Sequence, residues 1–180
     1  MGRSRYKVLN NQYPYFLTCT VVNWIPVFNK PEIVELLFNS LIFMQDHKRL
    51  FVHAYVVMEN HMHLICSSNE LSKEIGKFKR YTARIIIDHL CEQGRSRILR
   101  QLAYYRLRHR KDRKYQFWQE SSHPVECYNE NVFKSRFDYI HNNPVECGYV
   151  DEPWHWRYSS ARNVWGYEAM MDIVRLDAAL

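Results

Sequence analysis

The chain has 180 residues, a length that suits one domain spanning residues 1–180. Hydrophobic residues make up 47% and aromatic residues 15% of it, which is enough for a buried core and excludes a disordered chain. No apolar run is long enough to cross a membrane and no signal peptide is recognisable, so we expect a cytoplasmic protein without a membrane partner. Lysine and arginine number 25 against 19 acidic residues, and the net charge of +6 favours a nucleic-acid partner, with a merely basic surface as the alternative.

The N-terminal part of the chain predicts three strands and a helix. Tyr13 to Val22 is rich in aromatic and β-branched residues, as strands are. Lys30 to His47 repeats its apolar residues with the 3.6-residue period of a helix. Phe51 to Met58 and His61 to Cys66 are apolar runs separated by two residues, so they predict an antiparallel hairpin.

The rest of the chain predicts two more helices and a short strand. We expect a helix over Glu70 to Cys91, a strand at Phe117 to Gln119 and a helix from Asn129, as its N-cap, to Asn142. Pro144 is expected to end that last helix, because proline disfavours helical backbone in the residue before it. This order of elements predicts an α+β fold, an antiparallel sheet with helices packed on one face.

Two regions carry basic residues that could contact phosphates. On the helix Glu70 to Cys91, four basic side chains follow steps of four, three and four residues and share one side. The segment Arg95 to Lys114 holds nine more basic residues beside tyrosines that can stack on unpaired bases, and we expect it to be flexible or partly helical. A solvated helix face and a solvated linker are the alternatives. The candidate DNA contacts are Lys73, Lys77, Arg80, Arg84, Arg106, Arg108, Arg110 and Lys111, together with Arg136 farther along the chain.

The sequence His61-Met62-His63 opens one strand of the predicted hairpin. Residues two apart on a strand point to the same face, so both imidazoles project together and can share a divalent metal ion. Two ordinary strand histidines are the alternative, and the spacing alone favours it. The apolar strand around the pair strengthens the metal interpretation, because buried histidines need partners.

Tyr139 lies on the last predicted helix, off the centre of its apolar stripe. Arg136 and Asn143 lie three residues before and four residues after it, so they share its side of the helix. A tyrosine followed one turn later by an asparagine can place a phenol beside a metal ligand. A partly buried tyrosine packed on the sheet is the alternative.

The combination of these motifs resembles a known family. The stretch AYVVMENHMHLIC is similar to the HUH motif of single-tyrosine transposases. The stretches FWQESSHPVECYNENVFKSRFDYIHNNPVECGYV and WHWRYSSARN are similar to the C-terminal half and tail of the REP-associated tyrosine transposases. The resemblance covers nearly the whole chain, and the motifs occur in the family's order. Ser122-His123-Pro124-Val125 departs from the commonest pattern, which leaves the role of His123 open.

The resemblance implies a ferredoxin-like fold with a basic insertion and a C-terminal tail. It also implies a metal-dependent endonuclease and strand transferase that cleaves single-stranded DNA next to palindromic hairpins through a 5′-phosphotyrosine intermediate. His61 and His63 match the histidine pair, Tyr139 matches the nucleophile and Asn143 matches a third metal-supporting side chain. Imidazole with one amide oxygen suits Mg²⁺ or Mn²⁺, and Arg136 would favour phenolate character in the tyrosine.

Several alternatives stay open. A hairpin-DNA-binding protein of the same ancestry could have lost cleavage, and an unrelated metallohydrolase could use the histidine pair, although 180 residues leave little room for its larger barrel. Whether the tyrosine acts in cis or in trans is not determined by the sequence. A monomer is slightly favoured over a dimer.

Overall fold

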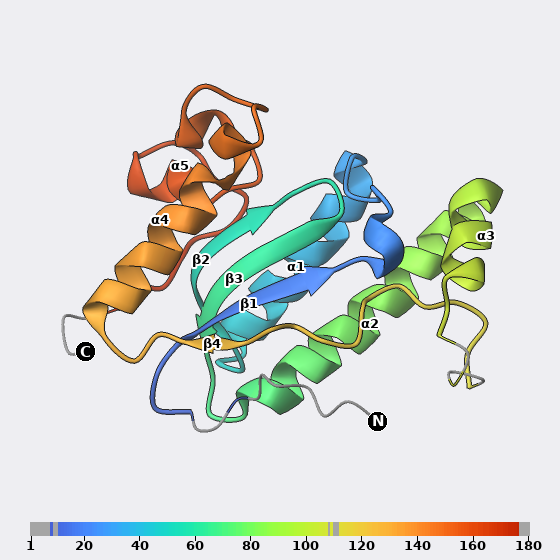
Figure 1. Cartoon of the computed structure of the whole chain (residues 1–180), viewed down its shortest axis with the longest axis horizontal. Coiled ribbons are helices and arrows are strands. Elements are labelled where there is room, and N and C mark those ends of the chain that lie inside the picture. The colour runs from blue at the N-terminus through green and yellow to red at the C-terminus, as the bar shows by residue number, and fades with distance from the viewer. Residues whose placement is uncertain (1–7, 9–10, 108, 110–111, 177–180) are drawn as a thin grey trace.

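The computed structural model describes residues 8, 11–107, 109 and 112–176. Four strands, β1 (Tyr15–Thr20), β2 (Phe51–Val57), β3 (His61–Ser67) and β4 (Val125–Glu126), form an antiparallel sheet in the order β2-β3-β1-β4 (Figure 1). With α1 between β1 and β2 and α2 between β3 and β4, this is the strand order of a ferredoxin-like sheet. The predicted α+β class and the β2–β3 hairpin are confirmed.

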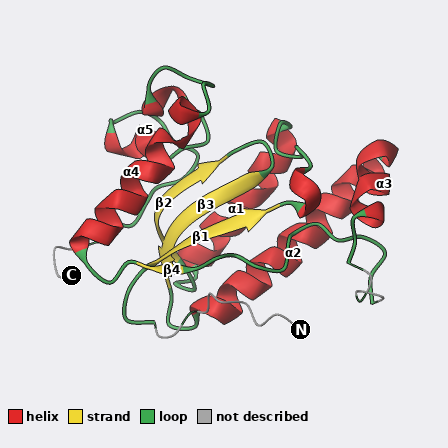
Figure 2. Ribbon diagram, viewed as in Figure 1, coloured by secondary structure: helices red, strands yellow, loops and turns green. Residues whose placement is uncertain are grey.

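The helices are α1 (Pro31–Asp46), α2 (Leu71–Glu92), α3 (Ser96–Tyr104), α4 (Glu130–Glu146) and the short α5 (Ala161–Val164). Two 3₁₀ turns, η1 (Val22–Trp24) and η2 (Pro153–His155), complete the regular structure of the described residues. Figure 2 shows that the described residues between α3 and β4 lie mostly in loop, as do those around the C-terminal helical turns.

The helices occupy both faces of the sheet, which corrects the predicted one-sided arrangement. Strand residues such as Leu17 and Leu64 pack against α1 and α2 in the larger core. The alternate residues, such as Phe16 and Ile65, pack with Ile140 of α4 in a second cluster on the opposite face. Because side chains alternate along each strand, an apolar residue at almost every strand position indicates a sheet covered on both sides.

The ends of α4 show one confirmed and one wrong prediction. The side chain of Asn129 accepts a hydrogen bond from the backbone nitrogen of Val132 at 2.9 Å, as an N-cap does. The helix does not end before Pro144 but continues through it to Glu146. It ends in a Schellman motif instead, in which Gly148 takes a left-handed φ of 72° and the nitrogen of Tyr149 donates to the carbonyl of Pro144 at 2.9 Å.

The predicted strand at Phe117 to Gln119 was wrong as well. Trp118 makes a single isolated bridge with Val21, and the fourth strand forms only at Val125–Glu126.

The C-terminal tail covers the outer edge of β2. There the backbone nitrogen of Val57 donates to the carbonyl of Tyr158, and the backbone nitrogen of Ser160 donates to the carbonyl of Tyr55. An otherwise open edge strand is therefore paired with the tail.

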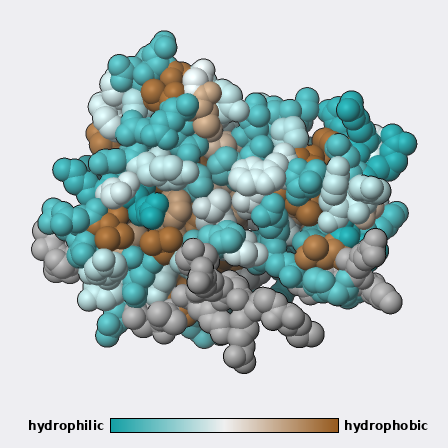
Figure 3. Space-filling model, viewed as in Figure 1, coloured by the Kyte–Doolittle hydropathy of each residue, from teal (hydrophilic) through white to brown (hydrophobic). Residues whose placement is uncertain are grey.

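The surface facing the viewer in Figure 3 is mainly hydrophilic, with apolar side chains gathered in separate patches. Among the described residues, no helix combines the length and the apolar character that crossing a membrane requires.

Candidate active site

The histidine pair lies on the sheet face that α4 covers. In the register of β1 with β3, Thr18 is opposite His63 and Thr20 is opposite His61. The two imidazole rings are 4.8 Å apart between centroids, whereas the intervening Met62 packs into the core on the other face. The predicted projection of both imidazoles to one face is confirmed.

Hydrogen bonds hold each imidazole through its Nδ1 atom. His61 Nδ1 lies 2.6 Å from Asn60 Oδ1, and because an amide oxygen only accepts, this nitrogen carries the proton. His63 Nδ1 lies 2.9 Å from Thr18 Oγ1. The Nε2 atom of each ring takes no part in these two hydrogen bonds. In metal-binding histidines one nitrogen likewise binds the metal while a neighbouring group orients the ring through the other nitrogen.

Burial keeps both imidazoles neutral near pH 7. It lowers the pKa of His61 to about 4, and burial together with the charge of His61 lowers the pKa of His63 to about 3. A neutral imidazole has a lone pair available for a cation.

Tyr139 of α4 lies against this pair. Its ring centroid is 5.3 Å from that of His63 and 5.8 Å from that of Phe16, and 37% of the residue is exposed. Arg136, one turn earlier, places its guanidinium 5.3 Å from the centre of the Phe16 ring. The structure therefore brings together His61, His63, Tyr139 and Arg136, all of which the sequence had singled out.

Asn143 is buried one turn after Tyr139. It is 7% exposed, and its Oδ1 atom has no hydrogen-bond partner among the described residues. A buried oxygen of this kind has been desolvated without compensation, which is a reason to expect a ligand that the chain does not itself supply. No described residues form a group of three or more histidine, cysteine or acidic side chains that could hold a metal ion. The available donors are thus two imidazole nitrogens and one amide oxygen, and this set fits a divalent cation that takes its other ligands from a substrate or water.

The sequence analysis did not single out three residues that contact the histidine pair. Thr18 and Asn60 bond to the imidazoles, and the ring of Phe16 stacks on His63 with centroids 5.2 Å apart. The strand periodicity places Phe16, Thr18 and Thr20 on one face of β1, but which residue of β3 each of them meets depends on a register that a single sequence does not reveal.

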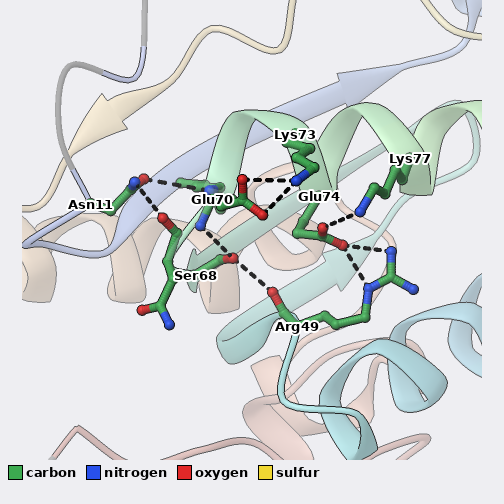
Figure 4. A network of polar contacts seen from close by, with 9 residues as sticks. Asn11, Arg49, Ser68, Glu70, Lys73, Glu74 and Lys77 are labelled. Carbon is green, nitrogen blue, oxygen red and sulfur yellow. Dashed lines mark hydrogen bonds and ion pairs between the residues drawn. The ribbon is translucent and has the colours of Figure 1, made fainter.

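The predicted basic stripe on α2 divides into two parts. Lys73 bonds both carboxylate oxygens of Glu70, at 2.8 and 2.7 Å, and Lys77 contacts the buried Glu74 at 2.6 Å (Figure 4). Arg49 also binds Glu74, so these two lysines belong to a network of ion pairs on the protein itself.

The second half of the stripe lies at a cavity. Arg80 and Arg84 line a cavity of about 1320 Å³ between α2 and residues 112–124, together with Arg113 and His123. Lys79, which the sequence analysis missed, also lines it and bonds the carbonyl of Gln119 at 2.7 Å. The cavity lies beside α2, and His123 lines it.

The basic insertion is partly helical, as predicted. Its helix is α3, and beyond it the guanidinium of Arg106 donates to the carbonyl of Arg113 at 3.0 Å. The other predicted contacts of this segment, Arg108, Arg110 and Lys111, lie outside the described residues.

Together, the fold and the side chains define a class of α+β protein in which a histidine pair on a strand contacts a tyrosine of a helix that covers the same face of the sheet. No protein-family model and no curated protein matches the chain. Among solved structures, the chain is similar over its whole length to a REP-associated tyrosine transposase bound to a REP hairpin. The alignment covers 100% of this chain and 98% of that chain with 20% sequence identity and a TM-score of 0.65. The likeness shows the fold that the sequence motifs had implied.

Proposed function

We propose that the protein is a metal-dependent single-stranded DNA endonuclease and strand transferase that acts next to palindromic hairpins, with Tyr139 as its nucleophile. One observation carries the proposal. The ring of the partly exposed Tyr139 lies 5.3 Å, between centroids, from that of the buried His63, whose partner His61 projects from the same face of the sheet. The similarity to a transposase bound to a DNA hairpin supports it. A DNA substrate fits the net charge of +6, and a cytoplasmic location is part of the proposal.

Tyr139 would attack the phosphorus of a phosphodiester through its phenolic oxygen. A bond forms between that oxygen and phosphorus, and the bond from phosphorus to the 3′ oxygen breaks. The phenolic proton leaves to solvent, and the departing 3′ oxygen takes up a proton from solvent. The products are a 5′-phosphotyrosine and a free 3′-hydroxyl. Because the new phosphodiester keeps the energy of the broken one, a 3′-hydroxyl can attack it in turn and join two strands. The guanidinium of Arg136, one turn from the tyrosine, adds positive charge beside the phosphate.

His61, His63 and Asn143 would hold the metal ion. Mg²⁺ or Mn²⁺ bound there would neutralise the nonbridging oxygens of the phosphate, which makes phosphorus a better electrophile. The protein's own part is to keep both imidazoles neutral by burial and to orient them by the bonds to Asn60 and Thr18. The orphaned oxygen of Asn143 is the feature that favours a third ligand from α4.

Tyr139 contacts His63 of its own chain, with ring centroids 5.3 Å apart, which supports catalysis in cis. A monomer suffices for such a site, and we propose a monomer as the active form. Size-exclusion chromatography with light scattering would test it, and a dimer at the concentrations used for cleavage would contradict it.

A covalent-adduct assay tests the proposed function. A labelled single strand that contains a hairpin is incubated with the protein and Mn²⁺, and denaturing gels reveal protein-linked label. We expect an adduct in the wild type and none in Tyr139→Phe, with hairpin binding retained, while Tyr128→Phe, a change at an exposed tyrosine ahead of α4, keeps the adduct. An adduct that survives in Tyr139→Phe would overturn the assignment. Hairpin binding without any adduct in the wild type would leave the binding-only alternative.

A further inference from the structure

The turn that follows β1 holds a tryptophan in an unusual backbone conformation. Trp24 has a φ of +56° and follows Asn23, whose φ is +50°. Left-handed backbone is tolerated by glycine, asparagine and aspartate, but for a bulky side chain it is a genuine outlier. Such strain persists only where the surrounding structure imposes it, and it is concentrated at functional sites.

Buried neighbours on both sides fix this turn. Val22 before it and Ile25 after it are buried in the larger core, and the backbone nitrogen of Val22 donates to the carbonyl of Phe117 at 2.7 Å. The nitrogen of Trp24 donates to the carbonyl of Val21 at 3.0 Å. Trp24 is 55% exposed and belongs to neither core cluster. Core packing therefore does not account for a tryptophan at this position.

The indole is placed at one end of the candidate active site. Its ring centroid lies 5.4 Å from that of His61, at an interplanar angle of 73°. His61 is 4.8 Å from His63, which is 5.3 Å from Tyr139. These four rings form a continuous row with the buried His63 inside it, the exposed Tyr139 at one end and the exposed Trp24 at the other.

We propose that Trp24 is a stacking platform for an unpaired base of the DNA strand, on the nucleotide that lies across the histidine pair from Tyr139. The inference rests on the proposed function, because it places the attacked phosphate at the pair. A strand that presents a phosphate between the two ends of the row would bring a neighbouring base over the indole. Aromatic rings stack on any base, so the platform holds the strand without reading its sequence.

An exposed tryptophan without a role is the competing explanation. Phe43, another exposed aromatic residue, lies in the helical backbone of α1, where its exposure involves no strain. Trp24 is exposed, strained and in contact with a candidate metal ligand. These three properties together distinguish it from Phe43.

The variant Trp24→Asn separates a DNA contact from a structural role. Asparagine removes the ring and suits left-handed backbone, so the variant should unfold at the same or a higher urea concentration than the parent. Both are made in the Tyr139→Phe background, which prevents turnover, and binding of labelled oligo(dT) is measured by fluorescence anisotropy. We expect affinity to fall about 5- to 150-fold, the equivalent of one lost stack. Trp24→Phe should restore most of the affinity.

Three comparisons make the result specific. The salt dependence of binding should not change, because no charge is removed. Binding to a blunt duplex, which offers no unpaired base, should be equal in Trp24→Asn and its parent. Phe43→Asn, a control at a residue that is 52% exposed on the helix behind the sheet, should bind oligo(dT) as the parent does.

Wild-type affinity for oligo(dT) in Trp24→Asn, or an equal loss on oligo(dT) and duplex, would overturn this inference. The adduct assay separates that failure from a failure of the proposed function. An adduct formed by a protein in which Trp24→Asn changes nothing would leave the function standing without the platform. A selective loss in Trp24→Asn with no adduct in the wild type would leave the platform on a binding protein.

Discussion

At the scale of single residues, Asn143 gives a prediction about stability as well as metal binding. Its buried Oδ1 has no hydrogen-bond partner among the described residues, and such an atom costs about 1–3 kcal/mol. Asn143→Leu keeps the approximate volume and removes that oxygen. We expect the metal-free variant to be more stable by about 1 kcal/mol in urea unfolding, and to lose most of the rise in melting temperature that Mn²⁺ causes in the wild type.

Asn143→Asp is the matched control for this prediction. A carboxylate in place of the amide is a better ligand for a divalent cation, so the melting-temperature shift with Mn²⁺ should be kept or enlarged. If Mn²⁺ raised the melting temperature of Asn143→Leu as much as that of the wild type, Asn143 would not be a metal ligand.

The histidine pair could be predicted from the sequence because the alternation of a strand is fixed by its backbone geometry. The same argument could not reach Phe16 or Trp24. Phe16 meets His63 through the register between two strands, and Trp24 reaches His61 through a left-handed turn. Both features depend on the packing of the whole sheet, which no local pattern encodes.

At the scale of elements, the N-cap of α4 should contribute to stability. Asn129 accepts the backbone hydrogen bond of Val132, and losing such a cap typically costs about 1 kcal/mol. Asn129→Ala should therefore lower the free energy of unfolding by about that amount in urea titrations. Asn129→Asp, which can accept the same bond, should keep the wild-type value, and equal losses in both variants would contradict the capping role.

The other end of α4 was mispredicted because proline was given too much weight. Proline lacks one backbone donor, but the packing of buried Ile140 and Pro144 against neighbouring elements carries the helix through it. Gly148 was the better signal, since a glycine after a helical pattern supplies the left-handed residue that closes a Schellman motif.

The two halves of the basic stripe on α2 should differ in their effect on DNA binding. Lys73 and Lys77 are paired with carboxylates, whereas Arg80 and Arg84 line a cavity. If both arginines contact phosphates, changing them to glutamine should flatten the log–log salt dependence of single-strand binding by about 1.4 units, at about 0.7 per contact. Changing the two lysines to glutamine alters the net charge equally and should leave the slope nearly unchanged. Equal slopes in the two double variants would show that pairing on the protein surface is irrelevant to binding.

At the scale of the whole molecule, the two-sided sheet explains how the site is built. α1 and α2 bury one face, and this leaves the other face to α4 and the histidine pair. The sequence predicted the class and the strand pairing through hairpin spacing and periodicity. It did not predict the face that each helix covers, because an amphipathic pattern shows that a helix buries one side without showing on which sheet surface.

Three buried histidines and the half-buried His61 should make the whole fold sensitive to acid. Burial lowers the pKa of His53, of the pair His61 and His63, and of His141, from the usual 6.5. Above pH 6.5 neither the folded nor the unfolded chain protonates these rings, so their contribution to stability is complete. As the pH falls below 6.5, the unfolded chain binds protons on these rings and the folded chain does not. The free energy of unfolding therefore decreases until the pH reaches the pKa values that the histidines have in the folded chain.

His53 offers the clearest test of this acid sensitivity, because it lies away from the candidate metal ligands. Its Nδ1 donates to the carbonyl of Val174 at 2.7 Å and its Nε2 lies 2.9 Å from Ser67 Oγ, so both ring nitrogens are engaged in the neutral form. Each proton taken up on unfolding steepens the fall in stability by about 1.4 kcal/mol per pH unit. Urea unfolding at a series of pH values below 6.5 should therefore give a shallower slope, by up to that amount, in His53→Gln than in the wild type. His155→Gln, a control at an exposed histidine, should keep the wild-type slope. If His53→Gln also kept the wild-type slope, the buried His53 ring would take up its proton without unfolding.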